Sequence, residues 1–157
     1  MSVDHVRDYL TQFGAQDRIL EFDVSSATVA LAAEALGCEP GRIAKTLSFM
    51  AGEQPMLIVF AGDARIDNRK YKDRFGVKAK MMTAEEIEGQ TGLHFGGVCP
   101  FGIPETVDLY LDVSLKRFNP VYPACGSSNS AIEVTLDELE RFSRARGWID
   151  VGKEPEN

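Results

Sequence analysis

Apolar positions along the chain follow the spacing of helices in some segments and of strands in others. From Val3 to Phe13 they recur at the helical period, which predicts a helix capped by Ser2 and stopped by Gly14. The same signals predict four more helices, over 28–37 with a cap at Ser25 or Ser26, over 67–75 opened by Asp67, over 84–91, and over 136–147.

Short apolar runs bounded by turn residues predict the strands. They cover 19–23, 44–51, 56–62, 77–83, 107–112, 121–125 and 131–135. The sequence GEQP between the second and third runs predicts a β-hairpin. Strands joined mainly by hairpins, with helices at the start, middle and end, indicate a single α+β domain over 1–150 around a mixed, mostly antiparallel sheet. A frayed tail is expected from residue 149 onward, and 151–157 is set apart as a C-terminal tail.

Composition narrows the class of protein. The chain has 157 residues and 44% hydrophobic content, which is enough for one sizeable core. The longest apolar runs are too short to cross a bilayer, so no membrane association is expected. The cysteines, Cys38, Cys99 and Cys125, are odd in number and widely spaced, so a disulfide framework is not expected and a reducing cytoplasm is.

The net charge of −7 argues against bulk electrostatic coating of nucleic acid. One segment, 62–80, departs from this average with a net charge of +4, against −11 for the rest of the chain. Its predicted helix carries Arg69, Lys70, Lys72 and Arg74. A solvated helix face and a phosphate-binding patch both fit this pattern.

Few side chains in the sequence are candidates for catalysis or metal binding. His5 and His94 lack partners for a triad, and no local spacing provides metal ligands, so neither a metal nor a cofactor is expected. Cys99 or Cys125 could act as a nucleophile, although inert packing is the favoured explanation for both. Lys45 interrupts an apolar strand, which is typical of a sheet edge or of a lysine directed into a cavity.

A cavity beside Lys45 would need further segments to form its other walls, and two glycine-containing segments are candidates. The apolar, glycine-rich stretch 92–104 can bring backbone N–H groups close to a ligand oxygen, chiefly at Gly96 and Gly97, and Pro100 directs its exit. The turn GSSN at 126–129 can do the same, with the Asn129 amide as both donor and acceptor. An ordinary tight turn is the alternative for each.

Four segments together resemble the YbaK/ProX-type aminoacyl-tRNA deacylases, relatives of the editing insertion domain of bacterial prolyl-tRNA synthetase. They are SSATVALAAEALGCEPGRIAKTLSF (25–49), GDARIDNRKYKDRFG (62–76), TGLHFGGVCPFGIP (91–104) and ACGSSNSAIEVTLDEL (124–139). The match spans nearly the whole chain. It implies the curved sheet with flanking helices of that family, and hydrolysis in trans of an ester-linked amino acid on a mischarged tRNA.

The resemblance also implies site residues. The family's essential lysine falls on Lys45, and its two glycine turns give Gly97 and Gly126 as catalytic donors. The residues implied to bind substrate are Ser26, Thr28, Gly96, Cys99, Pro100, Phe101, Gly102, Ser127 and Asn129. Where some members have an aspartate before the IE pair this chain has Ala131, so the amino acid specificity is not carried over.

The implied reaction is removal of cysteine or alanine, typically from tRNA(Pro). Backbone N–H groups would stabilise the tetrahedral oxyanion, Lys45 would hold the terminal phosphate or the carbonyl, and water would be the nucleophile, helped by a group of the substrate itself. Arg69, Lys70, Lys72 and Arg74 would contact tRNA phosphates. The implied partners are an aminoacyl-tRNA and prolyl-tRNA synthetase. The alternatives are a non-catalytic amino-acid, nucleotide or tRNA-binding module associated with a synthetase, and a thiol hydrolase.

Overall fold

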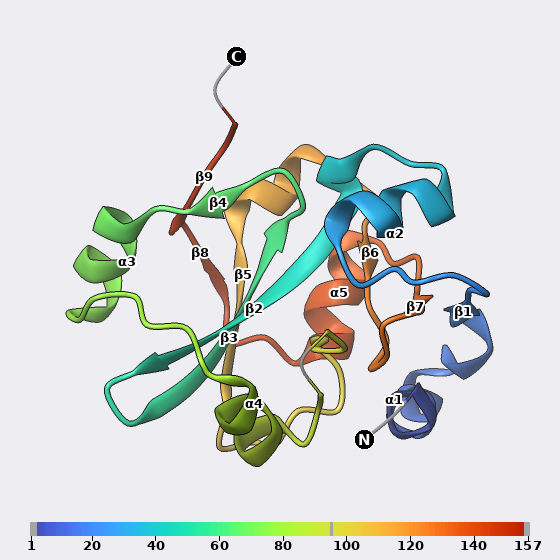
Figure 1. Cartoon of the computed structure of the whole chain (residues 1–157), viewed down its shortest axis with the longest axis horizontal. Helices are drawn as coiled ribbons and strands as arrows, with labels where there is room; N and C mark the ends of the chain where they lie inside the picture. The colour runs from blue at the N-terminus through green and yellow to red at the C-terminus, as the bar shows by residue number, and fades with distance from the viewer. Residues whose placement is uncertain (1–2, 95, 156–157) are drawn as a thin grey trace.

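The fold is built on one five-stranded mixed sheet with the strand order β6-β2-β3-β5-β8 (Figure 1). The computed structural model describes residues 3–94 and 96–155. The strands of this sheet are β2 (Ile43–Ala51), β3 (Gln54–Ala61), β5 (Asp108–Asp112), β6 (Tyr122–Pro123) and β8 (Trp148–Ile149). The single α+β domain with a mixed sheet, expected from the sequence, is confirmed.

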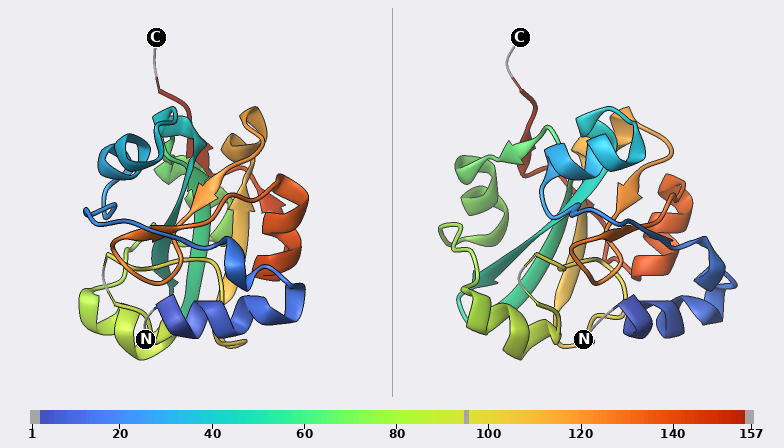
Figure 2. Two further views of the ribbon diagram at one scale, coloured as in Figure 1. Left: turned by 90° about the vertical axis from the view of Figure 1, so that its right-hand side faces the viewer. Right: turned by 45° about the vertical axis from the view of Figure 1, so that its right-hand side comes forward.

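The hairpin of β2 and β3 is the centre of the sheet. The two strands pair antiparallel from Ala44↔Ala61 to Ala51↔Gln54, as the hydrophobic pattern predicts. Every residue of β3 after Gln54 is buried, because helices cover both faces of the sheet; Figure 2 shows α2 (Val29–Leu36) and α5 (Leu136–Ser143) on opposite sides.

The antiparallel share is smaller than predicted. Within the five-stranded sheet only β2 and β3 pair antiparallel, while β6, β5 and β8 each join their neighbours in parallel. Parallel strands need crossover connections. Here β3 is followed by a connection of 46 positions, 62–107, before β5 begins, and local turn signals do not reveal the direction of a strand reached in that way.

The remaining elements surround this sheet. The helices are α1 (Val3–Leu10), α3 (Asn68–Phe75) and α4 (Ala84–Thr91), with short 3-10 turns η1 (Thr11–Phe13), η2 (Gln16–Arg18), η3 (Pro40–Arg42) and η4 (Val113–Arg117). Two small antiparallel pairs join distant segments, β1 (Leu20–Glu21) with β7 (Ser130–Ala131) and β4 (Arg65–Ile66) with β9 (Gly152–Lys153).

Several predicted boundaries need correction. Thr28, and neither Ser25 nor Ser26, caps α2 by accepting from the Leu31 N–H. The strand predicted over 77–83 is wrong, since Met81 forms only an isolated bridge with Phe49. The last helix ends at Ser143. The Ser2 cap lies outside the described residues.

The prediction of fraying from residue 149 is also wrong as far as residue 153. Val151 is fully buried, and its N–H donates to Oδ1 of the buried Asp112, as does the Gly152 N–H. The core holds the Val151 side chain, and the Asp112 carboxylate holds the two N–H groups. Nothing in the sequence identifies Asp112 as their acceptor. The C-terminal segment is therefore a structural part of the domain through β9.

Candidate functional site

A pocket of about 460 Å³ opens at the edge of β2. It lies where β6, which pairs only with Ile43 and Ala44, has ended, and before the segment at Met82 takes over the edge through the Met82 N–H to Ser48 O bond. Its wall comes from the start of α2, from β2, from α4 and from the segments around residues 81, 96–98 and 122–131. The volume is typical of small-molecule sites.

Lys45 lies in this wall. Its side chain is half-buried, and Nζ donates to the carbonyl oxygen of Gly62 at 3.3 Å. Burial lowers the pKa of Lys45, nearby Asp63 opposes that shift, and Arg65 adds to it. The sequence left two environments open for Lys45, a sheet edge and a cavity, and both hold. β6 pairs with β2 only as far as Ala44, so Lys45 lies on a locally open edge, and it lines the cavity there.

The turn after β3 fixes the partner of Lys45. A side chain at Gly62 would overlap the Pro40 carbonyl oxygen and approach Val29, so glycine alone allows this close packing. The next residue, Asp63, forms a two-point ion pair with Arg117, with Nη1 to Oδ2 at 3.1 Å. The guanidinium lowers the pKa of Asp63, so this carboxylate remains charged beside Lys45.

The glycine-rich loop contributes less than expected. Gly96 lines the pocket, but Gly97 does not, and the Gly97 N–H already donates to His94 O at 2.9 Å. Gly97 instead packs against Gly126, where an added Cβ would lie 3.0 Å from the Gly126 carbonyl oxygen. The two glycines predicted as oxyanion donors therefore hold the loop and the turn together, and the Gly97 N–H is not free to act as predicted.

Val98 also lines the pocket, but the four residues after it do not. Cys99 and Phe101 are fully buried in the core, Pro100 is buried, and the Gly102 carbonyl oxygen contacts His5 Nε2 at 3.0 Å. Burial raises the pKa of the Cys99 thiol to about 12, and that of Cys125 well above its usual range, so both thiols are protonated at neutral pH.

Within the 126–130 turn, residues 126–129 lie outside the pocket wall and support it, while Ser130 lines the pocket. The Asn129 amide bonds within the protein, since Nδ2 donates to Phe22 O at 3.0 Å and Oδ1 accepts from Ser127 Oγ at 2.9 Å. Asn129 does not line the pocket, and its role in binding a ligand stays a prediction. The turn holds the segment before α2, since the Ser26 N–H donates to Ser128 O at 2.6 Å.

That segment does reach the pocket. Ser26 and Thr28 both line it, together with Ala27 between them. The Ser26 hydroxyl also donates to Ser128 O, and Thr28 is the N-cap of α2, so both side chains have structural partners. Among the predicted site residues, Lys45, Gly96, Ser26 and Thr28 come together at one cavity.

The basic helix α3 is only partly free for nucleic acid. Lys70 pairs with Asp150 at 3.1 Å and donates to Gly152 O, which attaches the helix to the C-terminal segment. Arg74 lies over the rings of Phe75 and Tyr110. Arg69 and Lys72 are exposed. Figure 1 shows α3 at the opposite end of the molecule from α2, so the helix is remote from that wall of the pocket.

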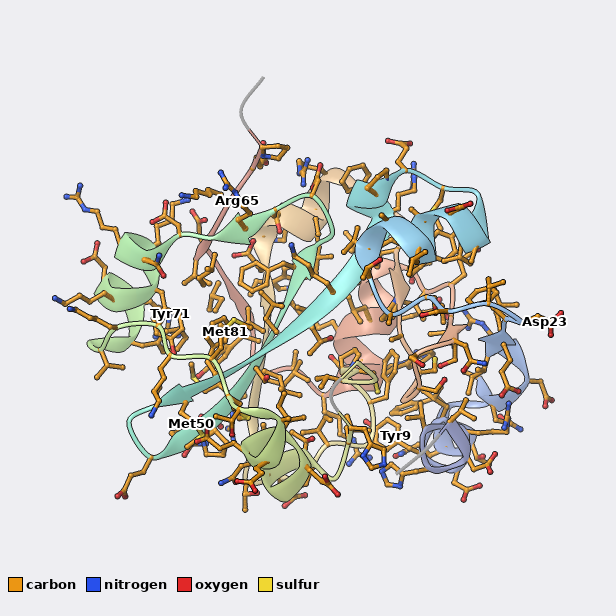
Figure 3. All side chains as sticks on the ribbon, viewed as in Figure 1. Tyr9, Asp23, Met50, Arg65, Tyr71 and Met81 are labelled. Atoms are coloured by element: carbon orange, nitrogen blue, oxygen red, sulfur yellow. The ribbon has the colours of Figure 1, made fainter. Side chains whose placement is uncertain are left out.

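Sequence reasoning missed several pocket residues. They are Thr46, Ser48, Met81, Met82, Ile87 and Tyr122. Met81 is 54% exposed and lies along β2 (Figure 3). A large exposed apolar residue between two predicted helices could have been noticed, but the others lie within ordinary amphipathic patterns. Within residues 3–94 and 96–155, no cluster of His, Cys, Asp or Glu is suited to a metal ion, and no helix is long and apolar enough to span a membrane.

Comparison with known proteins gives the context of this pocket. The YwhH protein of Bacillus subtilis, which is uncharacterised, is 54% identical over 98% of this chain and 99% of its own length. A candidate Cys-tRNA(Pro)/Cys-tRNA(Cys) deacylase of Enterococcus faecalis, EbsC, is 30% identical over 68% of this chain and 66% of its own. A crystal structure of a candidate trans-editing enzyme for prolyl-tRNA synthetase matches with a TM-score of 0.86 and 29% identity, over 96% of both chains.

The family model described as the aminoacyl-tRNA editing domain matches residues 24–142. These residues contain Lys45, the glycine-rich loop, the 126–130 turn and every lining residue of the pocket. The chain therefore belongs to the aminoacyl-tRNA editing domain family.

Proposed function

We propose that this protein is a trans-editing aminoacyl-tRNA deacylase, which hydrolyses the ester of a small amino acid, cysteine or alanine, on tRNA(Pro). The observation that carries this proposal is the half-buried Lys45 ammonium in the wall of a pocket of about 460 Å³. Family membership and the likeness to a candidate Cys-tRNA deacylase support it. Its place of action in this proposal is the cytoplasm, where its substrate is made.

In this proposal Lys45 binds the anionic part of the substrate. A lysine ammonium whose burial lowers its pKa has lost hydration, so an added phosphate or a polarised carbonyl oxygen would be favourable next to it. Its present acceptor, Gly62 O, is a single neutral carbonyl at 3.3 Å, which leaves two of the three ammonium protons for a ligand.

Water is the proposed nucleophile. The two buried thiols are protonated, and neither is part of the pocket wall. The side chains of this wall, over the described residues, include no His, Asp or Glu that could serve as a general base. The substrate's own amino group or ribose hydroxyl is therefore assigned the task of positioning the water.

The pocket wall suits a small side chain. Ala27, Ala32, Ala44 and Ala131 contribute methyl groups, and Met82 and Ile87 add larger apolar side chains. Such a wall discriminates weakly against a missing methylene, about 1 to 3 kcal/mol, but it excludes a bulky side chain sterically. An editing site of this kind acts as a sieve on size.

The test is a panel of tRNAs, each carrying one mischarged amino acid, incubated with the protein. We expect catalytic release of cysteine or alanine from tRNA(Pro), and a loss of about 100-fold or more in rate for Lys45→Ala with an unchanged circular dichroism spectrum. If Lys45→Ala cleaves as fast as the parent, the proposed role of Lys45 is wrong. If no ester in the panel is cleaved, the proposed function is wrong.

The bonded Gly97 N–H favours one second candidate, a module that binds an aminoacyl or nucleotide group without cleaving it, for example beside prolyl-tRNA synthetase. The two candidates differ in turnover. An enzyme releases many equivalents of free tRNA, whereas a binding module retains one equivalent of intact aminoacyl-tRNA.

A further inference from the structure

The outer edge of β2 is open for a short stretch inside the pocket. β6 pairs only with Ile43 and Ala44, and the segment 80–82 takes up the edge again at Ser48 and Met50. Between these contacts, Lys45, Thr46 and Leu47 pair with β3 on the inner side. All three residues line the pocket.

The direction of the Thr46 peptide groups follows from the alternation of a strand. In an extended strand the N–H and C=O of one residue point to the same side, and residues two apart point alike. Ser48 O accepts from the Met82 N–H at 3.0 Å and the Met50 N–H donates to Lys80 O at 2.9 Å, so both point away from β3. Thr46 lies two residues before Ser48 and four before Met50. Its N–H and C=O therefore also point away from β3, into the pocket.

The side-chain hydroxyl of Thr46 also indicates a ligand at this position. Among the described residues, three buried side-chain polar atoms have no hydrogen-bond partner, and they are Gln16 Oε1, Thr46 Oγ1 and Tyr71 Oη. Of these residues, only Thr46 lines the pocket. Because a buried hydroxyl normally has a partner, an unsatisfied one in a pocket wall indicates a ligand group that completes it.

We propose, resting on the proposed function, that Thr46 binds the aminoacyl group as a one-residue antiparallel β-strand. An α-aminoacyl ester carries one ammonium and one carbonyl group, and these match the C=O and the N–H of a single residue on a sheet edge. The Thr46 C=O accepts from the ammonium, and the Thr46 N–H donates to the ester carbonyl oxygen.

This arrangement supplies the oxyanion donor that Gly97 does not. Water adds its oxygen to the ester carbon, the carbonyl oxygen becomes the oxyanion that the Thr46 N–H stabilises, and the bond to the ribose oxygen then breaks. The proton released by the water ends on that ribose oxygen, so atoms and charge balance. Because residues opposite each other in a β-pair share a face, the substrate side chain lies beside the Thr46 side chain, where Oγ1 can bond a thiol or hydroxyl.

The first test uses two stable analogues, 3′-(alanylamino)-3′-deoxyadenosine and its 3′-propionylamino counterpart, which lacks only the ammonium. We expect the unmodified protein to bind the first analogue about tenfold or more tightly. In a ¹⁵N-labelled sample, the Thr46 amide resonance is expected to move on binding, while that of Met50, which is already bonded to Lys80 O, serves as the internal control. Equal affinities, or a stationary Thr46 resonance, would overturn the inference.

Variants provide the second test. Thr46→Pro removes the N–H without breaking a bond to β3, and we expect kcat to fall about 100-fold or more with a small change in KM. Thr46→Val keeps the peptide group and the volume, and is expected to slow cleavage of cysteinyl-tRNA about tenfold more than cleavage of alanyl-tRNA. A folded Thr46→Pro with full activity, or a Thr46→Val that treats both substrates as the parent does, would overturn it.

These outcomes separate the inference from the proposed function. If the parent protein cleaves mischarged tRNA but the Thr46 measurements show no effect, the function stands and the inference fails. If the parent cleaves nothing and yet binds the alanyl analogue with the expected Thr46 shift, the docking site stands and the hydrolase fails.

Discussion

Lys45 is placed where its charge costs stability and serves binding. It lies on β2 just after β6 has stopped pairing, and burial lowers its pKa relative to a free lysine. The folded protein therefore disfavours the charged form that a phosphate requires. Such a residue is expected at a site whose ligand, once bound, compensates the lost hydration.

We expect Lys45→Met to raise the free energy of unfolding at pH 7 while it abolishes deacylation. Because the pKa of Lys45 is lower in the folded state, the parent protein gains stability as pH rises from the folded pKa toward 10.5. The advantage of the Met variant should shrink over that alkaline window, and denaturant titrations at pH 7 and pH 10 measure it. A parent more stable than the variant at pH 7 would contradict this account.

Helix α5 is held at its start by one carboxylate. Glu138 closes a capping box with Thr135 and pairs with Arg18 at 2.7 Å. These contacts lower the pKa of Glu138 to about 2, with the Arg18 hydrogen bond as the first cause. The pair connects α5 to η2 across 120 positions of sequence, so it links elements that the local signals predict separately.

Glu138→Gln should reduce the free energy of unfolding by about 1 kcal/mol at pH 7, since the ion pair is partly exposed. A carboxylate with a lowered pKa contributes stability above its unfolded pKa, near 4.5, and loses it as pH falls toward about 2. Denaturant titrations from pH 7 to pH 2.5 should show the two proteins converging. A gap that stays constant over this range would rule out the ion pair as its source.

Helix α3 tests the proposed contact with tRNA. Arg69 and Lys72 are exposed, whereas Lys70 attaches the helix to Asp150. We expect the double variant Arg69→Ala and Lys72→Ala to weaken tRNA binding and to reduce the slope of log K against log salt by about 2, without loss of stability. Glu85→Ala with Glu88→Ala on the exposed side of α4 is the matched control. An unchanged salt slope would make the basic face a solvated one.

At the scale of the whole molecule, the C-terminal segment closes the fold over a buried carboxylate. Asp112 is 1% exposed and accepts from the N–H groups of Ser114, Val151 and Gly152. A charge buried to this extent is tolerable only with such donors. The last strand pair, β4 with β9, therefore depends on a residue of the central sheet.

Truncation after Asp150 should lower the free energy of unfolding by about 3 kcal/mol or more, because it removes two of the three donors to Asp112 and the fully buried Val151. Truncation after Lys153 leaves these contacts in place and is the control, with an expected change below about 0.5 kcal/mol. Thermal unfolding measures both. Equal loss in the two truncations would show that the outermost residues, not Asp112, carry the effect.

The sequence alone determined the local elements and the single most informative side chain. Helix ends at Gly37, Gly76 and Gly92, the β2–β3 hairpin and the Asp67 cap all follow from near neighbours in the chain, and the structure confirms them. A lysine within an apolar strand is likewise visible as a local exception, and the prediction that it can face a cavity is confirmed.

Only the tertiary structure decided which polar groups are free. The Gly97 N–H and the Asn129 amide looked available in the sequence, but His94, Phe22 and Ser127 already bond them. The Thr46 peptide group looked like any other in a strand, yet the neighbouring strand ends just before it. Whether a backbone group is satisfied depends on segments far away in the chain, and a linear pattern of residues does not contain that distance.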